Sequence, residues 1–145
     1  MLYYMNLIFY SLIVSLFWGI SPVFYKMIMN KVDTKLTFII NNLFFTLGVF
    51  VYTYYYWDQI KVDVQNISMR DTLAIGAIAI VLSFIPNIIY YNLINDHDSY
   101  VVSALVNSAP IFTVAVSYLL LKENITKYGM LGVVLIIIGV CCLSC

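Results

Sequence analysis

The chain has 145 residues, of which 63% are hydrophobic and only 10% are charged. A soluble domain is usually about 45–50% apolar and about 25% charged, so this chain lacks the polar residues to cover a globule of its size. Seven Lys and Arg residues balance seven Asp and Glu residues, which leaves no basic face for a nucleic-acid backbone. The composition argues against a water-soluble enzyme or a nucleic-acid-binding protein and indicates an integral membrane protein.

Five apolar stretches reach, or nearly reach, the length that crosses a bilayer. A hydrocarbon core of about 30 Å takes about 20 helical residues, and helices satisfy their own backbone hydrogen bonds in lipid. The polar breaks between the stretches are short and leave no room for an extramembrane domain. We therefore expect an all-α integral membrane protein, a single domain over residues 1–145, with five transmembrane helices at about 5–28, 35–57, 70–93, 99–121 and 127–145.

The first stretch contains a proline and a lysine. No basic region or small-residue cleavage site opens the chain, so we expect no cleavable signal peptide. Pro22 frees a backbone carbonyl and should kink the helix. Lys26 lies deep enough to be a functional candidate, because a charge at mid-bilayer costs at least ~2.5–3.5 kcal/mol. Its ammonium group either faces a cavity or snorkels to the interface.

Amides mark the second and third stretches. Asn41 and Asn42 lie inside the second, and Asn87 follows Pro86 in the third. An unpaired amide is costly in hydrocarbon, so these side chains should face other helices or a wet cavity. A capping box, Ser68-Met-Arg-Asp71, precedes the third stretch. The alternative for each amide is an interhelical hydrogen bond with no role toward a substrate.

The turn after the third stretch holds the single histidine, His97, between two aspartates. One imidazole on a five-residue turn is a weak set of metal ligands, so we expect a solvated turn and no metal site. Motifs of nucleotide-binding proteins, zinc hydrolases and serine hydrolases do not occur in the sequence. The chain is therefore predicted to have no catalytic residues, to require no cofactor and not to be an enzyme.

In the fourth stretch a proline follows polar and small residues, in the order Asn107-Ser108-Ala109-Pro110. Broken helices of this kind occur at transporter binding sites. Small residues recur every four positions at Ala109, Thr113 and Ser117 and at Ala104 and Ser108, which lets helices approach closely.

Three cysteines cluster at the end of the fifth stretch: Cys141, Cys142 and Cys145. An odd, clustered set inside an apolar run is no disulfide framework. We interpret these residues as small apolar packing groups, with palmitoylation or metal binding as alternatives.

The two ends of the chain carry a recognisable order of residues. Residues 16–26 read LFWGISPVFYK, residues 103–113 read SALVNSAPIFT, and residues 117–126 read SYLLLKENIT, followed by three spaced glycines. This order resembles the EamA-like domain of the drug/metabolite transporter superfamily, which typically has a Pro at the place of Pro110, a Glu that ends that helix, a Thr that opens the next, and glycines along it. The match covers nearly the whole chain, and its specificity rests on the two ends.

The resemblance implies a carrier or exporter of small metabolites or drugs. Members commonly contain two five-helix units, inverted relative to each other, around a central cavity, whereas this chain has one. It also lacks the membrane carboxylate of the small multidrug resistance branch, which speaks against proton-driven drug export. We therefore expect a half-size transporter that pairs with itself or with another half-size unit. A membrane assembly or accessory protein that kept the fold without transport is the alternative.

A mid-membrane cavity is the expected binding site for the solute, with Pro110 kinking the fourth helix beside it. Lys26 would meet an anionic group of the solute, whereas Glu123 would only end its helix. The residues predicted to line the cavity are Trp18, Lys26, Asn41, Asn87, Tyr91, Asn107 and Pro110.

The charges near the ends of the stretches barely specify an orientation. Four Lys and Arg residues fall on one side and three on the other, which is almost no bias under the positive-inside rule. Insertion in both directions should therefore cost little, and we predict an antiparallel homodimer in the plasma or inner membrane, with the lipid bilayer and a small solute as its other partners. A parallel dimer, a hetero-pair and a monomer are the competing outcomes.

Overall fold

The computed structural model describes residues 2–143, with side chains from residue 6 onward. Every regular element in that range is helical, and four helical stretches are long and apolar enough to cross a membrane: Asn6–Met29, Thr34–Tyr55, Met69–Asp96 and Ser99–Leu121. The expected all-α class is thereby confirmed. The last helix, α8 (Lys127–Leu143), has 17 described residues and falls short of that length, so the fifth transmembrane helix stays a prediction.

The chain forms two compact units. Unit 1 comprises Met1–Phe24 and His97–Cys145, and unit 2 comprises Tyr25–Asp96. Helix α1 (Leu2–Met29) is continuous and contributes its last turn and a half to unit 2.

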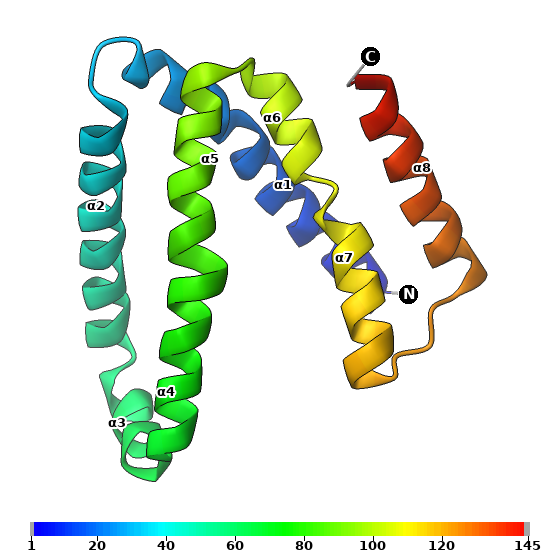
Figure 1. The fold of residues 1–145 in the computed structure, drawn as a ribbon. Coiled ribbons are helices and arrows are strands. Elements are labelled where there is room, and N and C mark those ends of the chain that lie inside the picture. Colours follow the sequence, from blue (N-terminus) through cyan, green and yellow to red (C-terminus); the bar gives the residue numbers. More distant parts are fainter. Residues whose placement is uncertain (1, 144–145) are drawn as a thin grey trace. The chain divides into compact units, whose positions relative to one another are not determined.

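Unit 2 is a hairpin of long helices. After α1 come α2 (Thr34–Tyr55), α3 (Trp57–Asn66), α4 (Met69–Ile78), the π-helical segment η1 (Ala79–Phe84) and α5 (Ile85–Asp96). Helix α2 packs against α5 and runs beside it in the opposite direction (Figure 1). Asp33 caps α2, since its Oδ1 accepts hydrogen bonds from the backbone N–H groups of Lys35 and Leu36.

The polar break expected after the second stretch contains a helix, α3. We expected only a short polar break over 58–69, but a segment too polar to cross the membrane still has the composition to form a helix. Of the capping box expected at its end, the Ser68 cap is confirmed. Ser68 Oγ accepts a hydrogen bond from the Asp71 backbone N–H at 3.1 Å and donates one to Asp71 Oδ2 at 2.6 Å.

A π-helical segment interrupts the third membrane-length helix just before Pro86. Proline has no N–H to donate to the carbonyl four residues earlier, and its ring crowds that carbonyl. Here the helix widens, and the Ile85 N–H bonds to Ile80 O, five residues back. The helical path thus continues through Pro86 with a bulge of the kind that is frequent at functional sites.

Unit 1 consists of α1 up to Phe24, α6 (Ser99–Val106), α7 (Ala109–Val116), the π-helical η2 (Ser117–Leu121) and α8. Helix α8 packs against both α6 and α7. Lys122 ends η2 in the left-handed conformation, at φ 56°. Thr126 precedes α8, and its Oγ1 accepts a hydrogen bond from the Gly129 N–H at 3.0 Å.

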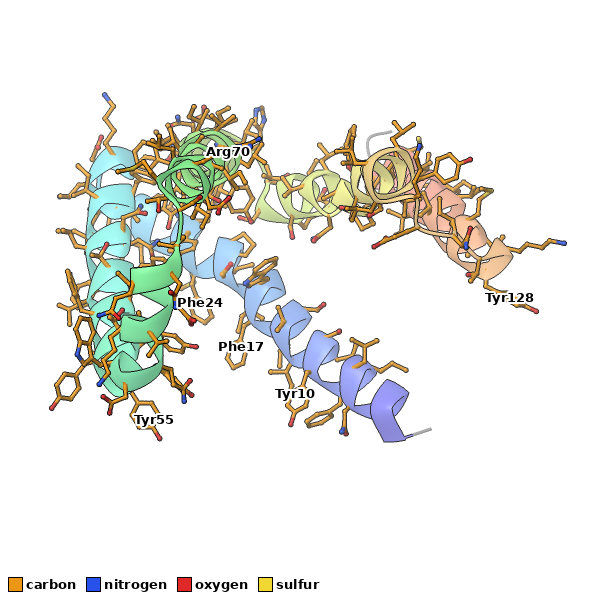
Figure 2. All side chains as sticks on the ribbon, turned by 90° about the horizontal axis from the view of Figure 1, so that it is seen from below. Tyr10, Phe17, Phe24, Tyr55, Arg70 and Tyr128 are labelled. Carbon is orange, nitrogen blue, oxygen red and sulfur yellow. The ribbon has the colours of Figure 1, made fainter. Side chains whose placement is uncertain are left out.

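Large apolar side chains cover the outside of the helices. Figure 2 shows Tyr10, Phe17 and Phe24 projecting to the same side of α1, where seven-residue spacing places them. They are 64%, 61% and 58% exposed. So much exposed apolar surface is unfavourable in water, whereas lipid tails are as apolar as these side chains. These side chains are therefore suited to contact with lipid.

Candidate functional site

Tyr25 joins two of the predicted cavity residues inside unit 2. Its hydroxyl donates a hydrogen bond to Asn41 Oδ1 at 2.8 Å, and its ring centroid lies 4.9 Å from that of Tyr91. The three residues come from α1, α2 and α5, so three helices meet at this point. The contact between Tyr25 and Asn41 bridges 16 positions of sequence and belongs to the tertiary structure, not to one helix.

Two phenylalanines complete an aromatic group around these residues. The Phe38 ring meets Tyr91 edge-on at 5.4 Å and Phe84 edge-on at 5.6 Å. Such edge-to-face pairs add about 0.5–1.5 kcal/mol beyond the burial of their area. We call the group formed by Tyr25, Phe38, Asn41, Phe84 and Tyr91 the Tyr25 cluster.

The Tyr91 side chain lies at the centre of the cluster and is 4% exposed. Its hydroxyl makes no hydrogen bond of ordinary geometry within the described residues, although Tyr25 is close enough to interact with it. A buried polar group left without a full partner costs about 1–3 kcal/mol. The cluster thus places an under-bonded hydroxyl among helices that are otherwise apolar.

Lys26 lies next to Tyr25 but reaches the end of another helix. Its Nζ donates a hydrogen bond to the backbone carbonyl of Asn95 at 3.2 Å, in the last turn of α5. Carbonyls at a helix C-terminus carry partial negative charge that attracts a cation. The ammonium group therefore helps to tie α1 to α5 at the edge of the apolar stretch, and its role toward an anionic solute stays a prediction.

The structure brings together only some of the predicted cavity residues. Asn41 and Tyr91 meet through Tyr25, and Asn87 lies one turn before Tyr91 on α5 with its side chain exposed. The other three predicted residues belong to unit 1, and all are exposed: Trp18, Asn107 and Pro110.

Three residues of the cluster were not among the predicted cavity residues: Tyr25, Phe38 and Phe84. A usable signal existed for Tyr25, because a tyrosine hydroxyl inside an apolar stretch needs a hydrogen-bond partner when it is buried. No comparable signal marks Phe38 and Phe84, which are two of nine phenylalanines in the chain.

The fourth membrane-length helix is broken where the sequence predicted a kink. Helix α6 ends at Val106 and α7 begins at Ala109, with Asn107 and Ser108 between them. Pro110 lacks the N–H that would bond to Val106 O. The Ser108 backbone N–H and Oγ instead both donate hydrogen bonds to Leu105 O, at 3.1 Å and 2.6 Å.

Pro22 has the opposite effect on α1, which continues through it. The carbonyl that Pro22 leaves without a backbone donor is Trp18 O, four residues earlier. Ser21 Oγ donates a hydrogen bond to that oxygen at 3.0 Å. The kink expected in the first helix therefore does not interrupt it, because a serine hydroxyl replaces the missing N–H.

A shallow hollow of about 440 Å³ runs along one face of α7 and η2 in unit 1. It includes two of the regularly spaced small residues, Thr113 and Ser117. Its lining is Phe112, Thr113, Val116, Ser117, Leu120 and Leu121.

Metal ligands do not gather in the described part of the chain, where His, Cys, Asp and Glu form no group of three. Cys141 and Cys142 are exposed on α8. Cys145, the remaining member of the predicted cysteine group, lies outside the described residues.

Comparison with known proteins agrees with the resemblance in the sequence. Residues 5–145 match the model of the EamA-like transporter family. An uncharacterized protein of Methanocaldococcus jannaschii is 30% identical over 136 residues, which cover 92% of this chain and 93% of that protein. No solved structure matches significantly. The chain is therefore a member of the EamA-like transporter family and an integral, multi-pass membrane protein.

Proposed function

We propose that the chain is a half-size transporter of small metabolites or drugs, and that the Tyr25 cluster forms part of its solute site. The observation that carries this proposal is the Tyr25–Asn41 hydrogen bond of 2.8 Å between two helices, beside the under-bonded Tyr91 hydroxyl. Polar groups inside a membrane protein are costly and commonly mark solute pathways. A solute with a hydroxyl, amide or carboxyl group can exchange hydrogen bonds with all three side chains.

Solute entry requires the cluster to open, because its rings are packed together. The Tyr25–Tyr91 and Phe38–Tyr91 contacts close the space between α1, α2 and α5. Lys26 also holds α1 and α5 together through its hydrogen bond to Asn95 O. We infer that this conformation is closed on the side of Lys26 and that movement of α1 relative to α5 admits the solute.

Five transmembrane helices and a single domain over residues 1–145 form the second part of the proposal. The 17 described residues of α8 are about 25 Å long at 1.5 Å per residue, slightly less than a hydrocarbon core of about 30 Å. Apolar residues occupy nearly all of α8, and a short span is accommodated by local thinning of the bilayer. Termini on opposite sides of the membrane follow from an odd number of spans.

Two copies should pair to enclose the cavity, in a plasma or inner membrane. The relative from Methanocaldococcus jannaschii has a similar length, since 93% of it aligns with this chain, whereas larger family members are expected to contain two inverted units. Exposed small residues on α7 offer a close contact between copies. We propose an antiparallel homodimer.

A cysteine introduced at Gln59 tests this arrangement. An impermeant reagent should label half of the molecules in intact cells and all of them after permeabilisation. All-or-none labelling would exclude it.

An accessory or assembly role is the second candidate. The Tyr25 and Asn41 side chains already satisfy each other, as expected for an interhelical contact that only holds helices together. Transport would then be absent from every solute tested, while loss of the hydrogen bond would still weaken the fold.

Transport by purified protein in liposomes, screened against a panel of metabolites, distinguishes the two candidates. Asn41→Leu should abolish uptake of the transported solute, and Tyr25→Phe should weaken it. Asn42→Leu is the matched control, because Asn42 Nδ2 donates to Phe38 O within its own helix at 2.8 Å. Equal transport by the Asn41 and Asn42 variants, with both folded, would remove the cluster from the site.

A further inference from the structure

Helix α3 lies between two membrane-spanning helices, α2 and α4, and very short linkers join it to both. Tyr56 alone lies between α2 and α3, and only Ile67 and Ser68 lie between α3 and α4. Figure 1 shows α3 at the turn of the α2–α4 hairpin, out of line with both helices. Because α2 ends and α4 begins at the same edge of the bilayer, both ends of α3 are held at that edge.

The ten residues of α3 divide into an apolar and a polar face. Trp57, Ile60 and Val64 follow the i, i+3, i+7 spacing that places them on one side of a helix. Trp57 is 57% and Val64 is 62% exposed, so the described chain leaves much of this side uncovered. Apart from Val62, the remaining residues are polar or charged: Asp58, Gln59, Lys61, Asp63, Gln65 and Asn66.

Tyrosines surround the joint at which α3 begins. The Tyr56 ring lies 4.6 Å from Tyr52 and 4.9 Å from Tyr55, measured between centroids. Tyr54 and Tyr55 are 86% and 79% exposed, and Figure 2 shows Tyr55 projecting outward. Tyrosine and tryptophan favour the boundary between headgroups and acyl chains, so the apolar face of α3 begins at that depth.

We propose that α3 lies in the plane of the membrane, with Trp57, Ile60 and Val64 against the upper acyl chains and its polar face toward water. Amphipathic helices bind at this depth through buried apolar area, with anionic lipids adding attraction where the helix is basic. In α3 two aspartates outnumber one lysine, and Lys61 Nζ is paired with Asp58 Oδ1 at 2.6 Å. The partner is therefore the phospholipid surface itself, irrespective of the charge of its headgroups.

The test uses the full chain with its three cysteines replaced by alanine, reconstituted in phosphatidylcholine nanodiscs. An environment-sensitive dye is attached to a single cysteine at Ile60 or Val64, and in matched controls at Gln59 or Asp63. The two apolar-face dyes should emit at shorter wavelength and be quenched by lipids brominated near the top of the acyl chain. The two control dyes should show neither effect, and added phosphatidylserine should change nothing.

Three results would overturn the proposal. Equal exposure of all four dyes to water would place α3 in solvent. A blue shift without quenching by brominated lipid would show that protein, such as a second copy, covers the apolar face. Quenching that rises only on addition of phosphatidylserine would indicate a charge-dependent contact.

Tryptophan fluorescence gives an independent measurement without cysteines in α3. In a Trp18→Phe protein, emission from Trp57 should be quenched by the same brominated lipid.

Discussion

Unit 2 has polar side chains that bond to other helices, beside local bonds such as that of Asn42, whereas Asn107 and Thr113 of unit 1 bond within their own segment. In unit 2, Tyr25 bonds to Asn41 on a second helix and Lys26 to Asn95 on a third element. In unit 1, Asn107 and Thr113 bond to groups four residues earlier in sequence. The first kind of bond fixes helices against one another, while the second only satisfies a group within its own segment. We therefore expect the effects of substitution to be larger in unit 2.

The largest effect should follow from loss of the Tyr91 ring. Tyr91→Ala removes a 4%-exposed aromatic side chain that contacts Tyr25 and Phe38, and such changes lower the free energy of unfolding by about 3–5 kcal/mol. Tyr128→Ala is the control in unit 1, because Tyr128 is 87% exposed and should change stability by less than about 0.5 kcal/mol. Denaturant unfolding in mixed micelles measures both. Similar losses for the two variants would contradict the comparison.

Replacement of Tyr91 by phenylalanine separates its ring from its hydroxyl. Since that hydroxyl makes no ordinary hydrogen bond within the described residues, Tyr91→Phe should leave stability unchanged or raise it by about 1 kcal/mol. Transport should nevertheless fall if the hydroxyl binds the solute. A loss of stability as large as that of Tyr91→Ala would show that the hydroxyl is fully bonded.

Pro110→Ala tests whether the break in the fourth helix is local. Alanine restores the N–H that can bond to Val106 O, so α6 and α7 should join. Stability should rise by roughly 1–2 kcal/mol, because the ~3 kcal/mol penalty of proline in a helix is partly offset by the freer unfolded chain. Slower amide hydrogen exchange at residues 107–111 would report the join. Pro22→Ala should gain less, since Ser21 already bonds to the exposed Trp18 carbonyl.

The sequence was sufficient for the helical class because long apolar runs need no tertiary information. It also located the proline break at Asn107 and Ser108 and the cap at Ser68, since both depend on neighbouring residues. It could not distinguish Asn41, which bonds across helices, from Asn42, which bonds to its own helix. Two adjacent asparagines differ only in the direction in which their side chains point, and that depends on how the helices pack.

A double-mutant cycle measures the coupling energy of the Tyr25–Asn41 hydrogen bond between helices. Tyr25→Phe and Asn41→Leu, singly and together, should give a coupling of about 0.6 kcal/mol and at most about 1.7 kcal/mol, the average and the maximum for interhelical hydrogen bonds in a membrane protein. The corresponding cycle in unit 1 pairs Asn107→Leu with Ser103→Ala, whose side chains are 3.3 Å apart within one segment. Its coupling should be about 0.2–0.5 kcal/mol. Equal couplings would remove the distinction between the units.

The smallest expected effect lies at the end of η2, where Lys122 adopts φ 56°. Left-handed backbone strains a residue with a Cβ and suits glycine, which commonly ends helices in this conformation. The Glu123 N–H bonds back to Ser117 O at 3.4 Å, so the turn closes around Lys122. Lys122→Gly should therefore raise the free energy of unfolding by about 0.5–1 kcal/mol. Lys122→Ala removes the same charge but keeps the Cβ, and it should give no such gain. A gain from both variants would assign the effect to the lysine charge near the membrane and would leave the backbone of unit 1 unstrained at this turn.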